Sequence, residues 1–216
     1  QSADGALATV TQDGDSTAPT YFPSNQSSIT QASAAIADVE QTGQQNMSNI
    51  MQQAGADGAL ATVRQTNPNA SAGAGDINTS MITQSSLTSA FVEQIGEGNT
   101  SLVNQSGTNA TLATNTVAAV EISQLGDDGY SRVEQSGTGN EASLTQLAGS
   151  SGAYSEIDQS GSDNFATVMQ GGMDNESYVD QSGSGNTAIV SQMSDGNIST
   201  ITQAGTTNTA TVTQGN

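Results

Sequence analysis

The chain has 216 residues and is polar and acidic, with 33% hydrophobic residues, 3% aromatic residues and a formal net charge of −19 at pH 7. It contains no histidine and no cysteine, which removes imidazole and thiolate chemistry, and its negative charge disfavours binding to nucleic acid or anionic membranes. No run of about 18 apolar residues is present, so we expect no transmembrane segment. This composition alone is typical of intrinsic disorder, so any fold has to come from the order of the residues.

The first half of the chain carries a long duplication. The sequence "ADGALATV" at residues 3–10 recurs unchanged at residues 56–63, a shift of 53 residues within the stretch 1–104. Three prolines fall in two eight-residue insertions, which we interpret as bulged loops rather than as a ligand contact. The 53-residue shift also relates Gln12 to Gln65, Gln31 to Gln84, Gln41 to Gln94 and Gln52 to Gln105.

The second half repeats a shorter unit. Residues 105–123 are irregular, and in residues 124–216 a glutamine recurs every eleven residues, apart from one thirteen-residue step at "LAGSSGA". Reading the stretch between Gln105 and Gln124 as two short units, with Asn115 in the glutamine position, gives eighteen units along the chain. Because related units run through the whole sequence, we expect residues 1–216 to form a single β-solenoid domain.

Each unit has the pattern N-x-A/S-x-V/I-x-Q, followed by a short link that is often rich in glycine. Its period of two predicts a β-strand of seven residues with four side chains on one face. None of the 72 side chains on these faces is charged, whereas the overall composition would place about eight charged residues there. Disorder does not produce such an exclusion, so the pattern predicts folded strands with a buried face.

Alternate units differ, which predicts two strands per coil. One type begins with asparagine, and the other often carries an acidic residue just before its glutamine. We therefore predict an all-β fold, a β-solenoid amyloid protomer of about nine two-strand coils of 22–24 residues, with parallel in-register stacking and two facing sheets. In the first four coils serine belongs to the asparagine-type strand and alanine to its partner, as in Ser27 and Ala8. From the sixth coil the two are exchanged, and we expect the exchange at the irregular fifth coil.

Amide side chains inside such a core need partners, because a buried amide without one costs roughly 1–3 kcal/mol. Stacked in register, each amide can donate to one neighbour and accept from the other, as in cross-β assemblies. The residue type then has to be conserved from unit to unit, because each copy stacks on another copy of itself. The predicted core ladder comprises Gln12, Gln31, Gln41, Gln52, Gln65, Gln84, Gln94, Gln105, Gln124, Gln135, Gln146, Gln159, Gln170, Gln181, Gln192, Gln203 and Gln214, with Asn25, Asn46, Asn78, Asn99, Asn140, Asn164, Asn186 and Asn208.

Charged side chains lie outside this core and, where opposite charges meet between coils, form weak surface ion pairs. The predicted pairs join Arg64 to Glu40 and Glu93, and Arg132 to Glu156. A further acidic column, Glu134, Asp158 and Asp180, has no cation between its members, so we expect acid or divalent cations to speed assembly. Asp-Gly turns such as "LGDDG" are ordinary turn formers, and no metal, cofactor-binding or catalytic residue is predicted.

Four segments carry a resemblance to a known family: "QSGTGNEASLTQ" (135–146), "QSGSDNFATVMQ" (159–170), "QSGSGNTAIVSQ" (181–192) and "QAGTTNTATVTQ" (203–214). Their pattern Q-x-G-x-x-N-x-A-x-x-x-Q resembles the repeat of curlins, the secreted subunits of bacterial extracellular amyloid fibres called curli. The resemblance implies export through an outer-membrane secretion channel and polymerisation started by a nucleator subunit. The chain departs from familiar members, which have about five coils, and in its partner strand serine lies four residues before the glutamine.

The function expected from these observations is structural rather than enzymatic. Soluble solenoids cap their terminal coils, whereas here strands are predicted close to both ends of the sequence, so we expect copies to stack head to tail. The chain would then be a subunit of a secreted, extracellular cell-surface fibre that serves biofilm matrix and adhesion. Two alternatives stay open: a minor nucleating curlin subunit, and a monomeric solenoid adhesin or ice-binding module.

Overall fold

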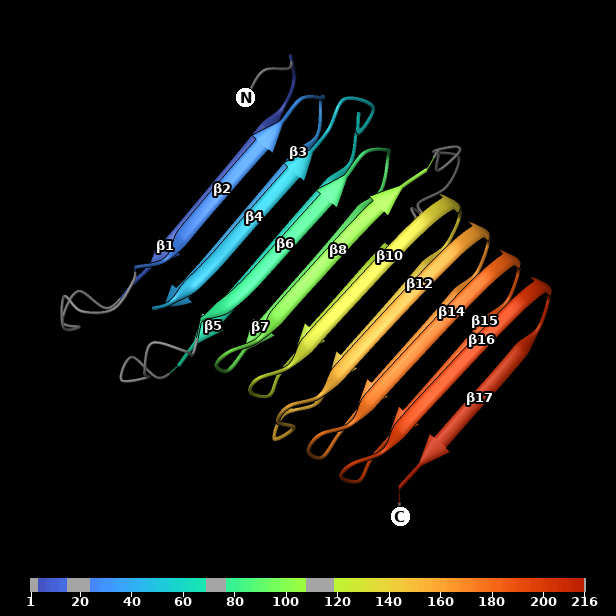
Figure 1. Cartoon of the computed structure of the whole chain (residues 1–216). Helices are drawn as coiled ribbons and strands as arrows, with labels where there is room; N and C mark the ends of the chain where they lie inside the picture. The colour runs from blue at the N-terminus through green and yellow to red at the C-terminus, as the bar shows by residue number, and fades with distance from the viewer. Residues whose placement is uncertain (1–3, 15–23, 69–76, 108–118, 216) are drawn as a thin grey trace.

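The computed structural model describes residues 4–14, 24–68, 77–107 and 119–215. In this part of the chain seventeen strands form two stacked sheets of nine and eight strands (Figure 1). The nine-stranded sheet contains, in spatial order, β1 (Leu7–Asp13), β3 (Ile36–Gly43), β5 (Leu60–Asn67), β7 (Ser89–Ile95), β9 (Ala119–Gln124), β11 (Glu141–Gln146), β13 (Phe165–Gln170), β15 (Thr187–Gln192) and β17 (Thr209–Gln214). The eight-stranded sheet contains β2 (Gln26–Gln31), β4 (Asn46–Gln52), β6 (Asn78–Gln84), β8 (Thr100–Ser106), β10 (Tyr130–Thr138), β12 (Tyr154–Ser162), β14 (Glu176–Ser184) and β16 (Ile198–Thr206).

Consecutive strands along the chain lie in opposite sheets, so each pair of strands makes one coil and the next coil stacks on it. Strands β1 and β17 lie at opposite ends of the stack (Figure 1). All strand pairs are parallel and in register; β12 and β14, for example, place Ser155 beside Ser177 and Gln159 beside Gln181. The predicted all-β solenoid with two facing sheets is therefore confirmed.

The predicted count of eighteen strands is wrong by one within the described residues. In an eighteen-unit count Gln124 would stack on Gln105, but Gln124 pairs with Gln94 and Gln146, and Gln105 pairs with Gln135. Each sheet therefore continues past the irregular segment with no strand inserted. Asn115, the residue assigned to the glutamine position of the extra unit, lies outside the described residues. The spacing of the glutamines along the sequence predicted one strand too many, because the stacking of like side chains, and not this spacing, sets the register.

The predicted exchange of alanine and serine between sheets does not occur either. In the nine-stranded sheet alanine stacks on alanine, interrupted by Val120, and in the eight-stranded sheet serine stacks on serine. The asparagines change sheet instead, because those of the first half lie at or just before strands of the eight-stranded sheet and those of the second half precede strands of the nine-stranded sheet. The alanine column is Ala8, Ala37, Ala61, Ala90, Ala142, Ala166, Ala188 and Ala210, and the serine column is Ser27, Ser48, Ser80, Ser101, Ser131, Ser155, Ser177 and Ser199.

A thin aliphatic core lies between the sheets. It is built from the valine, isoleucine and leucine two residues before each glutamine, and interior members such as Val39, Ile82 and Leu144 have no exposed surface. A fully buried side chain of this size contributes about 1.5–3 kcal/mol. At the N-terminal edge the corresponding Val10 is 46% exposed, because no further coil covers it within the described residues. The edges of the stack thus present the same core that the interior buries.

A column of glycines lets the chain turn near the ends of β10, β12, β14 and β16, the last four strands of the eight-stranded sheet. Gly137, Gly161, Gly183 and Gly205 have φ angles of 101–103°, a region that residues with a side chain rarely adopt. The stack also has no room for a side chain here, since a Cβ on Gly161 would lie 2.0 Å from the carbonyl oxygen of Gly183. The glycine two residues after these glutamines is therefore required by coil stacking as well as by backbone conformation.

We predict that Gly161→Ala destabilises the stack more than Gly196→Ala. Gly196 also has a positive φ of 67°, but nothing lies within 4 Å of a Cβ added there. The control should therefore cost only the left-handed strain, about 1–2 kcal/mol, whereas Gly161→Ala adds a clash with the neighbouring coil. Guanidinium unfolding followed by circular dichroism measures both, and equal midpoints for the two variants would contradict this explanation.

Candidate functional site

The seventeen predicted glutamines form two continuous ladders, one in each sheet. Nε2 of each glutamine donates to Oε1 of the glutamine in the next coil, at 2.7–3.2 Å in the nine-stranded sheet and 2.8–3.1 Å in the eight-stranded sheet. All except Gln12 and Gln214, at the two ends of one ladder, are buried. Every donor points toward the C-terminal end of the stack, so the ladders give the molecule a direction.

Most of these glutamines also join the two sheets, a role that sequence reasoning missed. Nε2 of Gln146, at the end of β11, donates to the backbone oxygen of Tyr130, where the facing strand β10 begins, at 3.0 Å. Gln159 bonds in the same way across the coil to the oxygen of Glu141 at 2.9 Å. The available signal was the position of glutamine at the end of the strand, directly before the turn. One amide thus satisfies a backbone carbonyl at the corner and extends the stack.

The asparagines form ladders of the opposite polarity. Nδ2 of Asn186 donates to Oδ1 of Asn164 at 3.0 Å, and the backbone N–H of Asn186 donates to the same oxygen at 3.1 Å. Asn175 and Asn197 form a further pair that the sequence did not predict. Side-chain or backbone donation links the predicted residues in two runs, Asn25, Asn46, Asn78 and Asn99, and Asn140, Asn164, Asn186 and Asn208.

We predict that Gln170→Met weakens the stack although methionine has a similar volume. The change leaves Nε2 of Gln146 without its acceptor and Oε1 of Gln192 without its donor, at about 1–3 kcal/mol for each buried group. Gln170→Glu should be worse at pH 7 and partly recover in acid, since a buried carboxyl is favoured in its neutral form. Guanidinium unfolding is the measurement, with Gln53→Met at an exposed turn as control. A midpoint for Gln170→Met equal to that of the unchanged chain would show that the ladder adds no stability.

The outward ion pairs follow the prediction in part. Arg64 forms an ion pair with Glu40 at 3.5 Å; Glu93 is its other neighbour in register, and the guanidinium lies 5.6 Å from the centre of the Phe91 ring. Arg132 was expected to pair with Glu156, which does lie beside it in register, but its ion pair is with Glu134 on the same strand at 2.6 Å.

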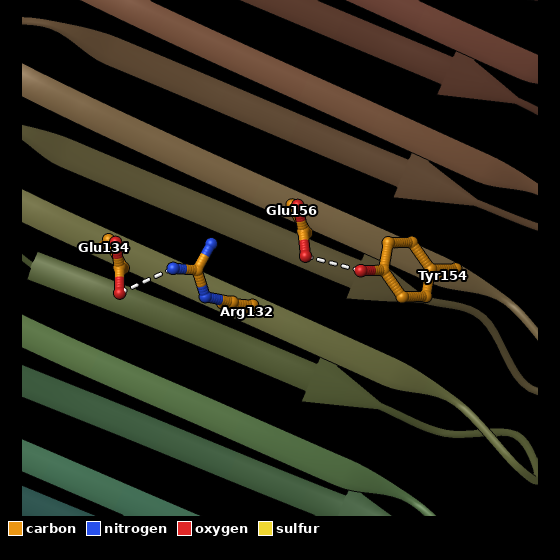
Figure 2. Close-up of polar contacts among 4 residues, drawn as sticks. All are labelled: Arg132, Glu134, Tyr154 and Glu156. Atoms are coloured by element: carbon orange, nitrogen blue, oxygen red, sulfur yellow. Dashed lines mark hydrogen bonds and ion pairs between the residues drawn. The ribbon is translucent and has the colours of Figure 1, made fainter.

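The carboxylate of Glu156 has a different partner, which explains this difference. It accepts a hydrogen bond from the hydroxyl of Tyr154, leaving Glu134 to Arg132 (Figure 2). The ring of Tyr154 stacks on that of Tyr130, with centroids 4.7 Å apart and planes 7° from parallel. Burial, followed by the hydrogen bond to Glu156, raises the pKa of the Tyr154 hydroxyl above its ordinary value. The pattern of the sequence does not reveal the bond between Tyr154 and Glu156.

The acidic column of β10, β12 and β14 is present as predicted in register. Glu134, Asp158 and Asp180 stack on one another. The pKa of Asp158 lies above its ordinary value, first because of partial burial and then because of the charges of Glu134 and Asp180, and Arg132 opposes the shift. A carboxyl whose pKa is higher in the folded than in the unfolded chain stabilises the fold fully below the unfolded pKa. That contribution is lost as the pH rises through the folded pKa.

The direction of the pKa shift of Asp158 gives a test at neutral pH. Asp158→Asn should raise the guanidinium midpoint at pH 7, where the charge of Asp158 is repelled by its neighbours, and leave it nearly unchanged well below the ordinary pKa of about 3.9. Glu141→Gln makes the same change of charge in the other sheet and serves as control. If Asp158→Asn lowers the midpoint at pH 7, repulsion within the column is not the dominant effect.

Turn aspartates tie one coil to the next. The Oδ1 atoms of Asp57, Asp127 and Asp195 accept hydrogen bonds of 2.8–3.0 Å from backbone N–H groups in the preceding turn of the same edge. Among the residues that the structure describes, no group of three or more histidine, cysteine, aspartate or glutamate side chains is placed to hold a metal ion. The same residues include no helix long and apolar enough to cross a bilayer.

The stacked coils can be compared with known families. Residues 156–183 and 183–215 match the family model of the curlin associated repeat. This part of the chain carries curlin-type repeats. These residues cover most of β12 and all of β13–β17. The same glutamine and aliphatic columns continue in register from there to β1, so the matched coils and the rest of the described solenoid share one construction. Curlins are structural subunits of secreted extracellular amyloid fibres, not enzymes. The comparison with curated proteins gives no match.

Proposed function

We propose that this protein is the major structural subunit of a curli-like fibre, in which copies stack head to tail outside the cell. The observation that carries the proposal is that both glutamine ladders run without a break to the outermost described strands. At the C-terminal edge, Nε2 of Gln203 and Gln214 donates across the coil and still has a second hydrogen directed along the stack. At the N-terminal edge, Gln12 is the first glutamine of its ladder and can accept such a bond.

The edge strands are suited to contact with a second copy. Aliphatic side chains that the interior buries are exposed or half-buried there, as for Val10 and Val212. Outward positions of β2, β16 and β17 carry no charged residue, although the chain holds 21 acidic residues. Stacking would therefore bury apolar surface and pair open strand edges without bringing like charges together.

Further parts of the proposal follow from the family and from the sheets. We propose that residues 1–216 form one solenoid domain, supported by the pairing of β7 with β9 and of β8 with β10 on either side of the irregular segment. In the cell, a nucleator subunit and an outer-membrane secretion channel would be the partners, and biofilm matrix and adhesion the roles of the fibre.

Val212→Lys tests the stacking of copies. It places a charge on the inward face of the last strand, whereas Thr211→Lys places the same charge on the outward face of that strand. Purified protein is incubated and examined by thioflavin fluorescence, electron microscopy and fibre diffraction. We expect fibres with the strand spacing of about 4.8 Å along their axis from the unchanged chain and from Thr211→Lys, and strongly slowed growth from Val212→Lys. If the unchanged chain stays monomeric, the proposal fails and a monomeric solenoid module becomes the better description.

A further inference from the structure

The unequal sheets restrict how two copies can stack. The described solenoid has nine strands in one sheet and eight in the other, and each coil rises by one strand spacing. If the next copy has the same orientation, pairing its β1 with β17 leaves its β2 separated from β16 by the width of a missing strand. Only one of the two sheets would then be continuous across the junction.

A half-turn about the stacking axis removes this gap. The strands of the two sheets run in opposite directions within a coil, so a half-turn carries each sheet onto the position and strand direction of the other. The next copy's β1 then pairs with β16 and its β2 with β17, and both sheets continue. We propose that successive copies in the fibre are related by a half-turn about its axis. This inference rests on the proposed head-to-tail stacking and adds the orientation of the copies.

The asparagine ladder supports the half-turn independently. In register, Asn208, which precedes β17, meets Asn25 of the next copy after a half-turn, but meets Ala6 of the next copy when the orientation is unchanged. Asn208 ends one run and Asn25 begins the other. Within the chain the asparagines move from the eight-stranded sheet to the nine-stranded sheet. A half-turn places the eight-stranded sheet of the next copy on the nine-stranded sheet of the first, so asparagine meets asparagine at the junction. The ladder then continues along one side of each junction.

The most exposed large hydrophobic side chains of the described residues give a third observation. Ile198 is 61% exposed and Leu7 is 55% exposed, the two highest values among such residues. Ile198 begins β16 and Leu7 begins β1. After a half-turn they are neighbours across the junction and cover each other, whereas in the unchanged orientation Leu7 would lie beside Thr209.

The outward charges fit the same arrangement. The outer faces of β13, β15 and β17, with residues such as Thr167, Ile189 and Thr211, carry no charged side chain. The outer faces of β2, β4, β6 and β8 are also uncharged. A half-turn places these two faces next to each other on one side of the fibre, where β17 pairs with β2 of the next copy. Neither of these two strands carries an acidic side chain on its outer face. Like-charge repulsion across this side of the junction is thereby avoided.

Cysteine cross-linking distinguishes the two orientations, because the chain has no cysteine of its own. Fibres are grown from equal mixtures of two single variants and oxidised, and covalent dimers are counted on denaturing gels. Leu7→Cys mixed with Ile198→Cys reports the half-turn, and Leu7→Cys mixed with Thr209→Cys reports the unchanged orientation. The double variant Glu176→Cys/Ile198→Cys, whose residues are neighbours within one chain, confirms that the oxidation links adjacent parallel strands.

We expect heterodimers at least tenfold more abundant from the first mixture than from the second. The reverse ratio, or no dimer from either mixture in fibres whose internal control is linked, would overturn the half-turn but leave head-to-tail stacking intact. A failure of the unchanged chain to form fibres would instead remove both proposals. A fibre reconstruction by electron microscopy provides a second measurement, since the half-turn requires that adjacent subunits superpose only after rotation by about 180°.

Discussion

Everything in this solenoid depends on the stacking of like side chains from coil to coil. An amide is suited to this because it carries a donor and an acceptor on opposite sides of one planar group, so a column of amides satisfies itself indefinitely. The same glutamine that bonds to its neighbour along the stack also bonds to a backbone carbonyl of the facing strand. A core only two aliphatic columns thick can therefore hold buried polar groups at every corner. In a globular protein of this composition, with 33% hydrophobic residues, the apolar surface alone would be too small to stabilise a fold.

Stacking also places constraints on residues that carry no side chain or a short one. Gly161 and its equivalents allow the chain to turn where a Cβ would touch the next coil. The inward position four residues before each glutamine holds a small residue along the described stack, alanine in one sheet, apart from Val120, and serine in the other. Four serine hydroxyls in the middle of their column, Ser80, Ser101, Ser131 and Ser155, are buried with no hydrogen-bond partner. Small size at this position is thus needed more than hydrogen bonding.

The sequence predicted the strands, the inward face and the glutamine ladders because these follow from a period of two and from repetition of Gln124, Gln135 and Gln146. It failed at residues 105–123, where repeat spacing and stacking register disagree, and one misplaced unit reversed the assignment of all later strands to the two sheets. The alanine and serine columns held the correct answer, since keeping Ala142 on the alanine side would have required seventeen strands. The exchange of partners among Arg132, Glu134, Glu156 and Tyr154 was out of reach for a different reason. Outward side chains choose among several neighbours, and the pattern of the chain does not rank them.

The two sheets are chemically alike in the columns that matter most for stacking. Strands of both carry an inward glutamine near their C-terminal end and a valine, isoleucine or leucine two residues earlier, so a strand of either sheet can continue the other. Only two columns distinguish them: alanine against serine, which are both small, and asparagine, which changes sheet within the chain. An alanine on serine contact at the junction leaves one hydroxyl near a methyl group, whereas a broken asparagine ladder would leave both donors and acceptors unpaired. The alanine and serine columns, which tolerate this mismatch, each stay in one sheet throughout the chain. The asparagine ladder, which tolerates a break least, is the one that changes sheet.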